Sequence, residues 1–465
     1  MTDDTKTDYR VGKDAFWARA WMTALVIGLI GGIGMMLTAG PERLGYSYLF
    51  GMFAAATFTL GGLFLVLIQF MTASHWGVSS RRIVEVVMSS APVIALLAIP
   101  FILGVGAKQL SLYDEWQGAG AHGDHAGEHG DSHSDEEHEG HGEHDEHGSL
   151  SIGASVAHAQ DHEDHHGAKG DHGDAHEEGH AHTPQETALH HEVIEAKLGY
   201  LNTRGWVTRA LVYLLIWTLL ALAYFTWSRK QDESSDPSLT VRMQKLAPIS
   251  LILFGLTLTF ASFDWLMSLE AAWFSTIFGV IIFAGSVIAI LAFTTLVGIS
   301  FYKRGLTGDA INLEHFHDLS KLMFGFVCFW TYVSFSQWML IWYAGIPEEA
   351  TWYHIRWEGG WKAVAYILIF GHFVAPFLLL ISRVQKRFLP WLQFMCFWLI
   401  LMHFLDIYWF VMPQAEGGFQ ISDAFALLFA IGILLAYVFW VLARVPLVPI
   451  GDPRFQRSVH HHQTH

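Results

Sequence analysis

Ten apolar segments, each about 20 residues long or longer, dominate this sequence of 465 residues. A segment of that length spans the hydrocarbon layer of a bilayer as an α-helix, whereas a β-barrel would show short alternating segments. The composition agrees, because only 15% of the residues are charged and 52% are hydrophobic. We therefore expect an all-α integral membrane protein with ten transmembrane helices. The predicted helices cover residues 20–39, 47–72, 84–106, 206–227, 246–267, 277–301, 319–345, 362–382, 390–412 and 423–444.

Basic residues are distributed unevenly between the loops. With the N-terminus in the cytoplasm, the loops and tails on that side carry 18 Lys and Arg. The short loops on the other side carry only Arg43 and Arg356 clear of helix ends. The positive-inside rule then places both termini in the cytoplasm. The expected organisation is an N-terminus with three helices (1–106), an external loop (107–205), seven helices (206–444) and a cytoplasmic tail (445–465).

The loop 107–205 holds 18 of the 28 histidines and accounts for the acidity of the chain. Its Gly, Asp and Glu content cannot bury a core, so we expect most of it to be disordered. The rest of the chain is nearly neutral, so charge gives no support to nucleic-acid binding. Imidazoles and carboxylates at this density could bind Zn²⁺, Ni²⁺ or Cu²⁺ weakly at several sites, or the loop could be a solvated insertion with incidental metal affinity. The metal-ligand candidates are His138, His141, His144 and His147.

Cysteine is rare in this sequence. Cys328 and Cys396 are too few for a disulfide framework, a thiolate-held iron–sulfur cluster or a covalent haem motif. Both are expected to be small core residues.

An aspartate near the outer end of the fifth predicted helix is the first intramembrane charge. A charge at a helix centre costs about 2.5–3.5 kcal/mol on insertion scales, so such residues need a reason. Ser250 and Thr257 precede Asp264 by 14 and 7 residues and share its helical face. This stripe could hold water leading to the carboxylate, or Asp264 could cap the following turn near Ser268 and Glu270.

Two further helices carry histidines. His403 and Asp406 are spaced i, i+3, which places imidazole and carboxylate on one face as in a proton relay, or as a static pair that fixes helix packing. His372 precedes Pro376 by four residues, so its carbonyl loses its helical donor. The imidazole of His372 and its freed carbonyl could bind a water or a ligand. Alternatively, this position could be only a proline kink that a neighbouring helix satisfies.

The seventh predicted helix carries a polar stripe from its inner end outward. Its members fall within roughly 80° of one another at about 100° per residue. Glu85 opens the third helix at the same inner level. The stripe comprises Asp318, Lys321, Gly325, Tyr332 and Ser336, with Gln337 beside it.

Five strings in the second half of the chain resemble the ten-helix NrfD-like (polysulfide-reductase-type) membrane subunits of alternative complex III, most closely the shorter, ActF-type subunit. Apart from the His-rich loop and the tails, the resemblance covers about 340 residues. Ala271 stands where that family usually has proline, and the His-rich loop is no hallmark of the family. The strings are FDWLMSLE (263–270), WFSTIFG (273–279), HDLSKLMFGF (317–326), FSQWMLIWYAGIPEE (335–349) and HFLDIYWFVMP (403–413).

This resemblance implies a subunit of a bacterial quinol:electron-acceptor oxidoreductase in the cytoplasmic membrane. The implied partners are a longer NrfD-like quinol-binding subunit, an iron–sulfur subunit and multihaem cytochromes c, with lipids around them and a terminal oxidase or soluble cytochrome as acceptor. This chain would bind no cofactor tightly and would provide proton half-channels. The outer half would use Asp264, Gln337, His372, His403 and Asp406, and the inner half Asp318 and Lys321.

The family resemblance also implies an architecture, and two aspartates fit it. Asp264 and Asp406 end the last helices of two groups of four, the second to fifth and the sixth to ninth. We therefore expect two four-helix bundles flanked by two further helices.

Other functions stay open at this point. Trp, His and Asp near a membrane interface also suit a quinone-binding subunit. His372 and His403 could be axial ligands of one haem. The His-rich loop is compatible with a divalent-metal transporter, and a structural scaffold subunit is a further alternative.

Overall fold

A computed structural model of the chain describes residues 9–11, 14–123, 184–415 and 417–461. Every regular element in this part of the chain is a helix, and ten helical segments are long and apolar enough to cross a membrane. The predicted fold class is therefore confirmed. The crossing segments are α1 (Ala15–Thr38), α2 (Pro41–Met71), α3 (Val78–Met88) with α4 (Ala91–Gly106), α7 (Thr203–Ser234), α8 (Pro237–Trp265), α9 (Phe278–Lys303), α10 (Leu313–Ala344), α12 (Trp361–Ile367) with η4 (Leu368–Val374) and α13 (Ala375–Leu380), α15 (Leu389–Val411) and α16 (Ile421–Leu442).

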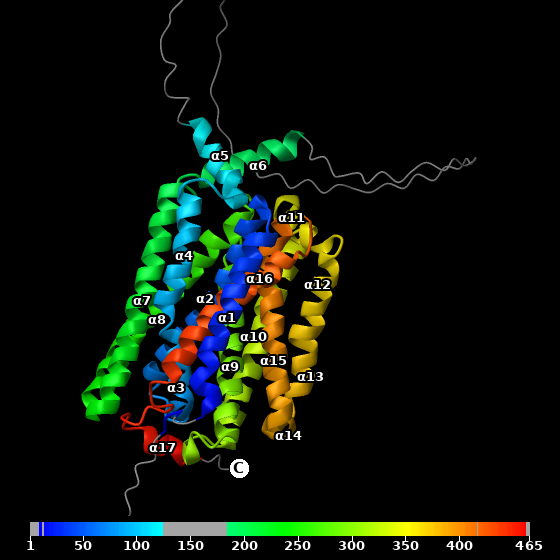
Figure 1. Ribbon diagram of the computed structural model, residues 1–465. Coiled ribbons are helices and arrows are strands. Elements are labelled where there is room, and N and C mark those ends of the chain that lie inside the picture. Colours follow the sequence, from blue (N-terminus) through cyan, green and yellow to red (C-terminus); the bar gives the residue numbers. More distant parts are fainter. Residues whose placement is uncertain (1–8, 12–13, 124–183, 416, 462–465) are drawn as a thin grey trace, which may run out of the picture.

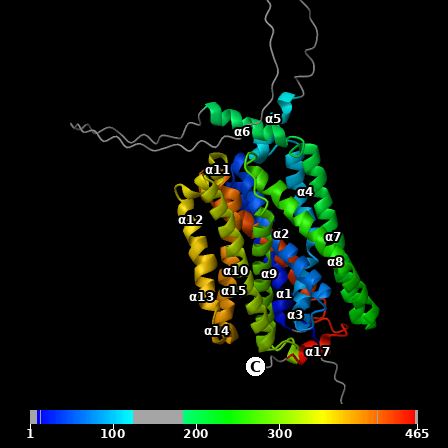
Figure 2. The ribbon, with the colours of Figure 1, turned by 180° about the vertical axis from the view of Figure 1, so that it is seen from behind.

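The crossing helices form two four-helix bundles and one flanking pair, as expected (Figures 1 and 2). In the first bundle α2 packs against α3, α4 and α8, and α7 packs against α4 and α8. In the second bundle α9 packs against α10 and α15, while η4 and α13 pack against α15 and α10. α2 and α9 join the two bundles and are the most buried helices, because each contacts elements of both. α1 and α16 pair with each other beside α2.

Local sequence signals set many of the helix ends. The Asp14 carboxylate caps α1 by accepting from the backbone N–H groups of Phe16 (3.0 Å) and Trp17 (3.1 Å). Asn312 caps α10 in a capping box with His315. These side chains satisfy N–H groups that have no partner inside the helix. At the other end of α10, Gly345 takes φ +62°, a left-handed conformation that glycine adopts without a Cβ clash.

Prolines interrupt two of the membrane crossings. Pro92 has no N–H for the carbonyl of Met88, and the crossing breaks there into α3 and α4. The crossing that contains Pro376 passes through a π-helical segment, η4, directly before the proline. The backbone ladder thus shifts register at the point where proline removes a donor.

The first and last described segments of the chain, which begin at residue 9 and end at residue 461, lie at one end of the helices, which we call the terminal end (Figure 1). The opposite end, which carries α5 (Asp114–Gly123), α6 (Pro184–Lys197) and α11 (Pro347–Trp357), is the loop end. The segment 107–205 therefore begins and ends in helices. Lys197 of α6 anchors them, since its ammonium group donates to the carbonyl of Ala271 (2.6 Å). At the terminal end, α17 (Phe455–Val459) docks through Ser458, whose hydroxyl lies 2.8 Å from that of Ser79. The remaining short elements are η1 (Ser111–Tyr113), η2 (Met267–Leu269), η3 (Gly308–Ala310), α14 (Arg383–Arg387) and η5 (Met412–Gln414).

Candidate functional site

A cavity of about 870 Å³ enters the second bundle between α10, α11, the α12–η4 segment and α15. Its walls are mainly apolar and include five tryptophans, which is typical of pockets that orient a ligand or water with few polar groups. Asp406 and Gln337 are among its lining residues. The cavity therefore reaches two of the residues that the sequence singled out.

Asp406 lies on α15 with 2% of its surface exposed. Its Oδ2 accepts a hydrogen bond from Trp330 Nε1 at 3.0 Å. Its Oδ1 is buried and has no hydrogen-bond partner within the described residues. A buried carboxylate oxygen without a donor is costly, so this atom marks a place for a water, a proton or a ligand group.

His403 lies one turn before Asp406 and is fully buried. Its Nε2 is 2.8 Å from the Thr57 hydroxyl of α2, and that hydroxyl donates to the Ala54 carbonyl at 2.6 Å. We assign the single hydroxyl proton to this carbonyl, so that Nε2 carries the hydrogen of a neutral His403 and donates to the Thr57 oxygen. Nδ1 is then a lone-pair acceptor, and it has no partner in the part of the chain that is described.

Gly285 of α9 makes the space in front of these two groups. A Cβ on this glycine would lie 3.1 Å from His403 Nδ1 and 3.6 Å from Asp406 Oδ2. Both atoms thus face one small volume that any side chain would fill. That volume is where a proton could pass between the carboxyl group and the imidazole.

His372 completes the cluster from η4. Its ring stacks on Trp330 with centroids 4.1 Å apart and planes at 29°. It is fully buried, and neither ring nitrogen has a hydrogen-bond partner among the described residues. Among the described residues, Asp406, His403 and His372 together present four buried polar atoms without partners, and Trp330 contacts Asp406 and His372.

Gln337 lies nearer the loop end of the same cavity. Its carbonyl oxygen accepts from Ser275 Oγ (2.7 Å) and its amide donates to Tyr353 Oη (3.1 Å). Burial raises the pKa of Tyr353 to about 12, so the phenol stays protonated and is a fixed hydrogen-bonding group. The neighbouring stripe residues do not reach the cavity, because Tyr332 is 66% exposed and Ser336 Oγ donates to the Tyr332 carbonyl.

Behind the cluster, toward the terminal end, α15 presents an apolar layer. Its buried side chains there are Leu392, Met395, Cys396, Leu399 and Met402. At 1.5 Å per residue this stretch is about 15 Å long. The cluster is therefore separated from the terminal end by a layer that is hydrophobic on α15.

Asp264 belongs to the first bundle and has different chemistry. Arg209 of α7 pairs with both of its oxygens, at 2.9 and 2.8 Å. Both carboxylate oxygens are thus engaged in a bidentate pair that joins α7 to α8. The rest of its stripe also bonds to α7: Tyr213 Oη donates to Asp264 (2.7 Å), Trp217 Nε1 donates to Thr257 Oγ1 (2.9 Å) and Tyr224 Oη lies 3.2 Å from Ser250 Oγ.

Glu85 is enclosed at the terminal end of the first bundle. It pairs with Arg81 (2.7 Å) and Arg82 (3.0 Å), and both of its partners are fully buried. Arg81 also pairs with Asp452 at 2.7 Å. Burial alone would raise the pKa of Asp452, but Arg81 and Arg454 hold it well below its usual range. This cluster ties the C-terminal tail to the bundle.

Asp318 and Lys321 form an ion pair at the terminal end of the second bundle. Lys321 Nζ is 2.6 Å from Asp318 Oδ1, and His461 Nε2 is 2.8 Å from Oδ2. The Lys321 side chain is 46% exposed, so this pair lies at the surface. Gly325, the next member of the predicted stripe, is exposed as well.

Glu270 and Arg356 form a further ion pair, in which Arg356 belongs to α11 beside the cavity-lining Trp357. Arg356 Nη1 is 3.9 Å from Glu270 Oε2, and Arg356 also donates to the carbonyls of Trp409 (3.1 Å) and Phe410 (3.0 Å) at the end of α15. Burial raises the pKa of Glu270 and lowers that of Arg356 to about 9. Arg356 thereby fixes α11 over the end of α15.

The proposed metal ligands His138, His141, His144 and His147 lie outside the described residues. Within the described ranges no three His, Cys, Asp or Glu side chains are grouped so that they could hold a metal ion.

Sequence reasoning missed several partners. Arg209 could have been found, since it is a charge inside an apolar segment. Thr57, Gly285 and Trp330 carry no such signal, because isolated Thr, Gly and Trp are common in membrane helices.

These features define a multi-pass α-helical membrane protein with a buried carboxylate–histidine cluster beneath a cavity. The chain matches no family model and no curated protein.

Proposed function

We propose that this chain is a non-redox membrane subunit of a quinol:electron-acceptor oxidoreductase of the alternative complex III type. In this proposal it lies in the bacterial cytoplasmic membrane, with both termini in the cytoplasm and the loop end outside. Its partners are the NrfD-like quinol-binding subunit, the iron–sulfur subunit and the multihaem cytochromes, which carry the redox centres. The function of this chain is to conduct protons through half-channels, and this conduction is coupled to quinol oxidation in the neighbouring quinol-binding subunit.

The observation that carries this proposal is the group of unpartnered atoms on Asp406, His403 and His372. Structural polar pairs in a membrane bundle satisfy each other, as Asp264 and Arg209 do. This cluster instead leaves a carboxylate oxygen and three imidazole nitrogens without partners among the described residues, and its Asp406 lines the cavity. Such atoms can accept and release a proton without first breaking a strong ion pair.

The assigned hydrogen bonds identify the atoms between which the proton moves. A proton on Asp406 can move to His403 Nδ1, which is the lone-pair acceptor, and the Thr57 hydroxyl keeps accepting from Nε2–H. The apolar layer on α15 then separates the cluster from Asp318 and Lys321. A continuous aqueous pore would dissipate the membrane potential, which is worth about 2.3 kcal/mol per charge per 100 mV. An apolar layer that protons cross only after a conformational change avoids this loss and allows quinol oxidation to be coupled to proton transfer.

Asp264 and Glu85 have structural roles in this proposal. Arg209 and the arginines at the terminal end neutralise them, and both pairs join helices of the first bundle. The proton pathway therefore uses the second bundle, with Gln337 at the outer side.

The test is Asp406→Asn in the purified complex reconstituted in proteoliposomes. This substitution keeps the size and the acceptor for Trp330 while removing the titratable proton. We expect fewer protons translocated per electron, with haem content and uncoupled quinol oxidation near the wild-type level. Unchanged proton stoichiometry would mean that the cluster is structural and that the chain is a scaffold.

Asp264→Asn is the matched control. It removes one of two charges in a buried pair, so we expect a lower thermal stability and poorer assembly. A loss of proton translocation in stable, fully assembled Asp264→Asn complex would move the pathway to the first bundle.

The orientation is tested separately. After Cys328 and Cys396 are replaced by alanine, an impermeant thiol reagent on intact protoplasts should label Glu195→Cys on α6 and leave Gln456→Cys on α17 unlabelled. The opposite pattern would invert the two half-channels.

A second candidate function, quinone binding by this chain itself, is favoured by the cavity. Besides Asp406 Oδ1, two other buried lining atoms have no partner in the described chain: Ser334 Oγ and Trp409 Nε1. One acceptor and one N–H donor on aromatic walls would suit a planar head group. Photolabelling of the cavity by an azido-quinone tests this candidate. Weaker labelling in Trp409→Phe and Ser334→Ala than in the wild type would support it, and unchanged labelling would exclude it.

A further inference from the structure

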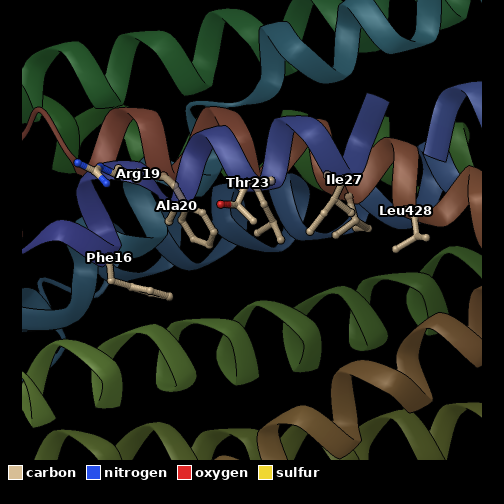
Figure 3. Close-up of a pocket in the computed structure, with 11 residues that line it drawn as sticks. Phe16, Arg19, Ala20, Thr23, Ile27 and Leu428 are labelled. Atoms are coloured by element: carbon tan, nitrogen blue, oxygen red, sulfur yellow. The ribbon is translucent and has the colours of Figure 1, made fainter. Parts of the chain in front are cut away.

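The pair of α1 and α16 carries a groove of about 490 Å³ on its surface (Figure 3). Phe16 and Ile27 of α1 mark its ends, and aliphatic residues of α16 such as Leu428 form the other wall. The helices can approach closely at its base, because a Cβ on Gly432 would lie 2.5 Å from Gly28 Cα. The groove is therefore a built feature of a rigid helix pair.

Arg19 is the one charged side chain that lines this groove. It is exposed and makes no hydrogen bond, ion pair or ring contact within the described residues. The nearby Arg304 is already engaged, since it pairs with Asp14 at 3.1 Å and lies over the Phe16 ring at 4.6 Å. Arg19 thus offers a positive charge to a ligand from outside the chain.

The length of the groove matches one leaflet of a bilayer. Phe16 and Ile27 are eleven residues apart, which corresponds to about 16 Å along the helix, while the hydrocarbon core is about 30 Å thick. Arg19 lies near the end of the groove that faces the terminal end, where a phospholipid headgroup of that leaflet would lie. A transmembrane helix of a partner would instead need a groove that crosses both leaflets.

We propose that this groove is a binding site for an anionic phospholipid. The acyl chain lies along Ala20, Thr23 and Ile27, and the phosphate pairs with the guanidinium of Arg19. Arg444 follows the last turn of α16, whose Phe439 lines the groove and contacts Trp17 of α1, so it adds positive charge near the same end. Its guanidinium donates to the Trp440 carbonyl and has no carboxylate partner in the described residues. The site is independent of the proton pathway in the second bundle.

The test is native mass spectrometry of the purified full-length chain titrated with phosphatidylglycerol or phosphatidylcholine. We expect a preferred first phosphatidylglycerol in the wild type. Arg19→Gln should weaken it about fivefold, the factor that corresponds to about 1 kcal/mol per basic residue at a membrane surface. Arg19→Lys should retain most of the preference, since it keeps the charge. Thr23→Trp should also weaken binding, because it fills the groove and leaves Arg19 in place.

Arg229→Gln on α7 is the matched control. It removes the same charge at the same end of the bundle but away from the groove, so phosphatidylglycerol binding should stay as in the wild type. Equal effects of Arg19→Gln and Arg229→Gln would overturn the proposal, since only general surface charge would then matter. If Thr23→Trp binds lipid normally but no longer copurifies with another subunit, the groove binds a protein partner and the proposal is overturned.

Discussion

Replacing Gly285 by alanine is a sharp test of the cluster in the second bundle, because this substitution changes neither the charge nor the hydrogen-bonding groups of the cluster. In Gly285→Ala the new methyl group would lie 3.1 Å from His403 Nδ1, where ordinary contacts are 3.4–4 Å. The imidazole must therefore shift by about 0.3 Å or more, and the volume between Nδ1 and Asp406 is filled. A 1 Å misplacement of reacting groups can cost about 100-fold in rate, so we expect proton transfer to fall about tenfold.

The fold should tolerate this change. Alanine is favoured over glycine in a helix by about 1 kcal/mol, which offsets the strain of one tight contact. Gly325→Ala on α10 is the matched control, because nothing lies within 4 Å of its Cβ position. Both variants should assemble and melt within a few degrees of the wild type.

Proton uptake and release during quinol oxidation in proteoliposomes would measure the difference. Gly285→Ala should translocate fewer protons per electron, and Gly325→Ala should behave as the wild type. If both variants translocate protons normally, His403 Nδ1 does not receive the proton, and our assignment of the relay is refuted.

Three further outcomes follow from the structure. Thr57→Val should leave the His403 Nε2–H without an acceptor and reduce proton translocation, whereas Thr57→Ser should retain it; equal activity of both in the proteoliposome assay would contradict the assigned tautomer. Asp452→Asn should lower the free energy of unfolding at pH 7 by about 3 kcal/mol, since it breaks a buried ion pair with Arg81. The pKa of Asp452 is depressed in the folded protein, so the stability difference between the wild type and Asp452→Asn should be present above about pH 4. It should shrink as the pH falls toward the folded pKa, as melting curves of both proteins at several pH values would show. Replacing residues 124–183 by a short linker should remove most of the affinity for Zn²⁺ and Ni²⁺ while assembly persists, and loss of quinol oxidation would show that the loop has a further role.

The sequence by itself determined the number and approximate positions of the helices long enough to cross a membrane. Apolar length sets where a chain can cross a bilayer, and this signal is local, so the ten predicted segments correspond to the ten observed crossings. Local spacing also placed His403 and Asp406 on one helical face, because i, i+3 residues are neighbours on any α-helix.

Only the tertiary structure decided which polar groups are satisfied. Asp264 and Asp406 look alike in sequence, yet the first meets Arg209 of α7 and the second meets Trp330 of α10. Helical periodicity says which face a residue occupies, but it does not say which helix packs against that face. The partner that sets the tautomer of His403 lies 346 residues away in the chain, and it is brought to 2.8 Å only by the packing of α2 against α15.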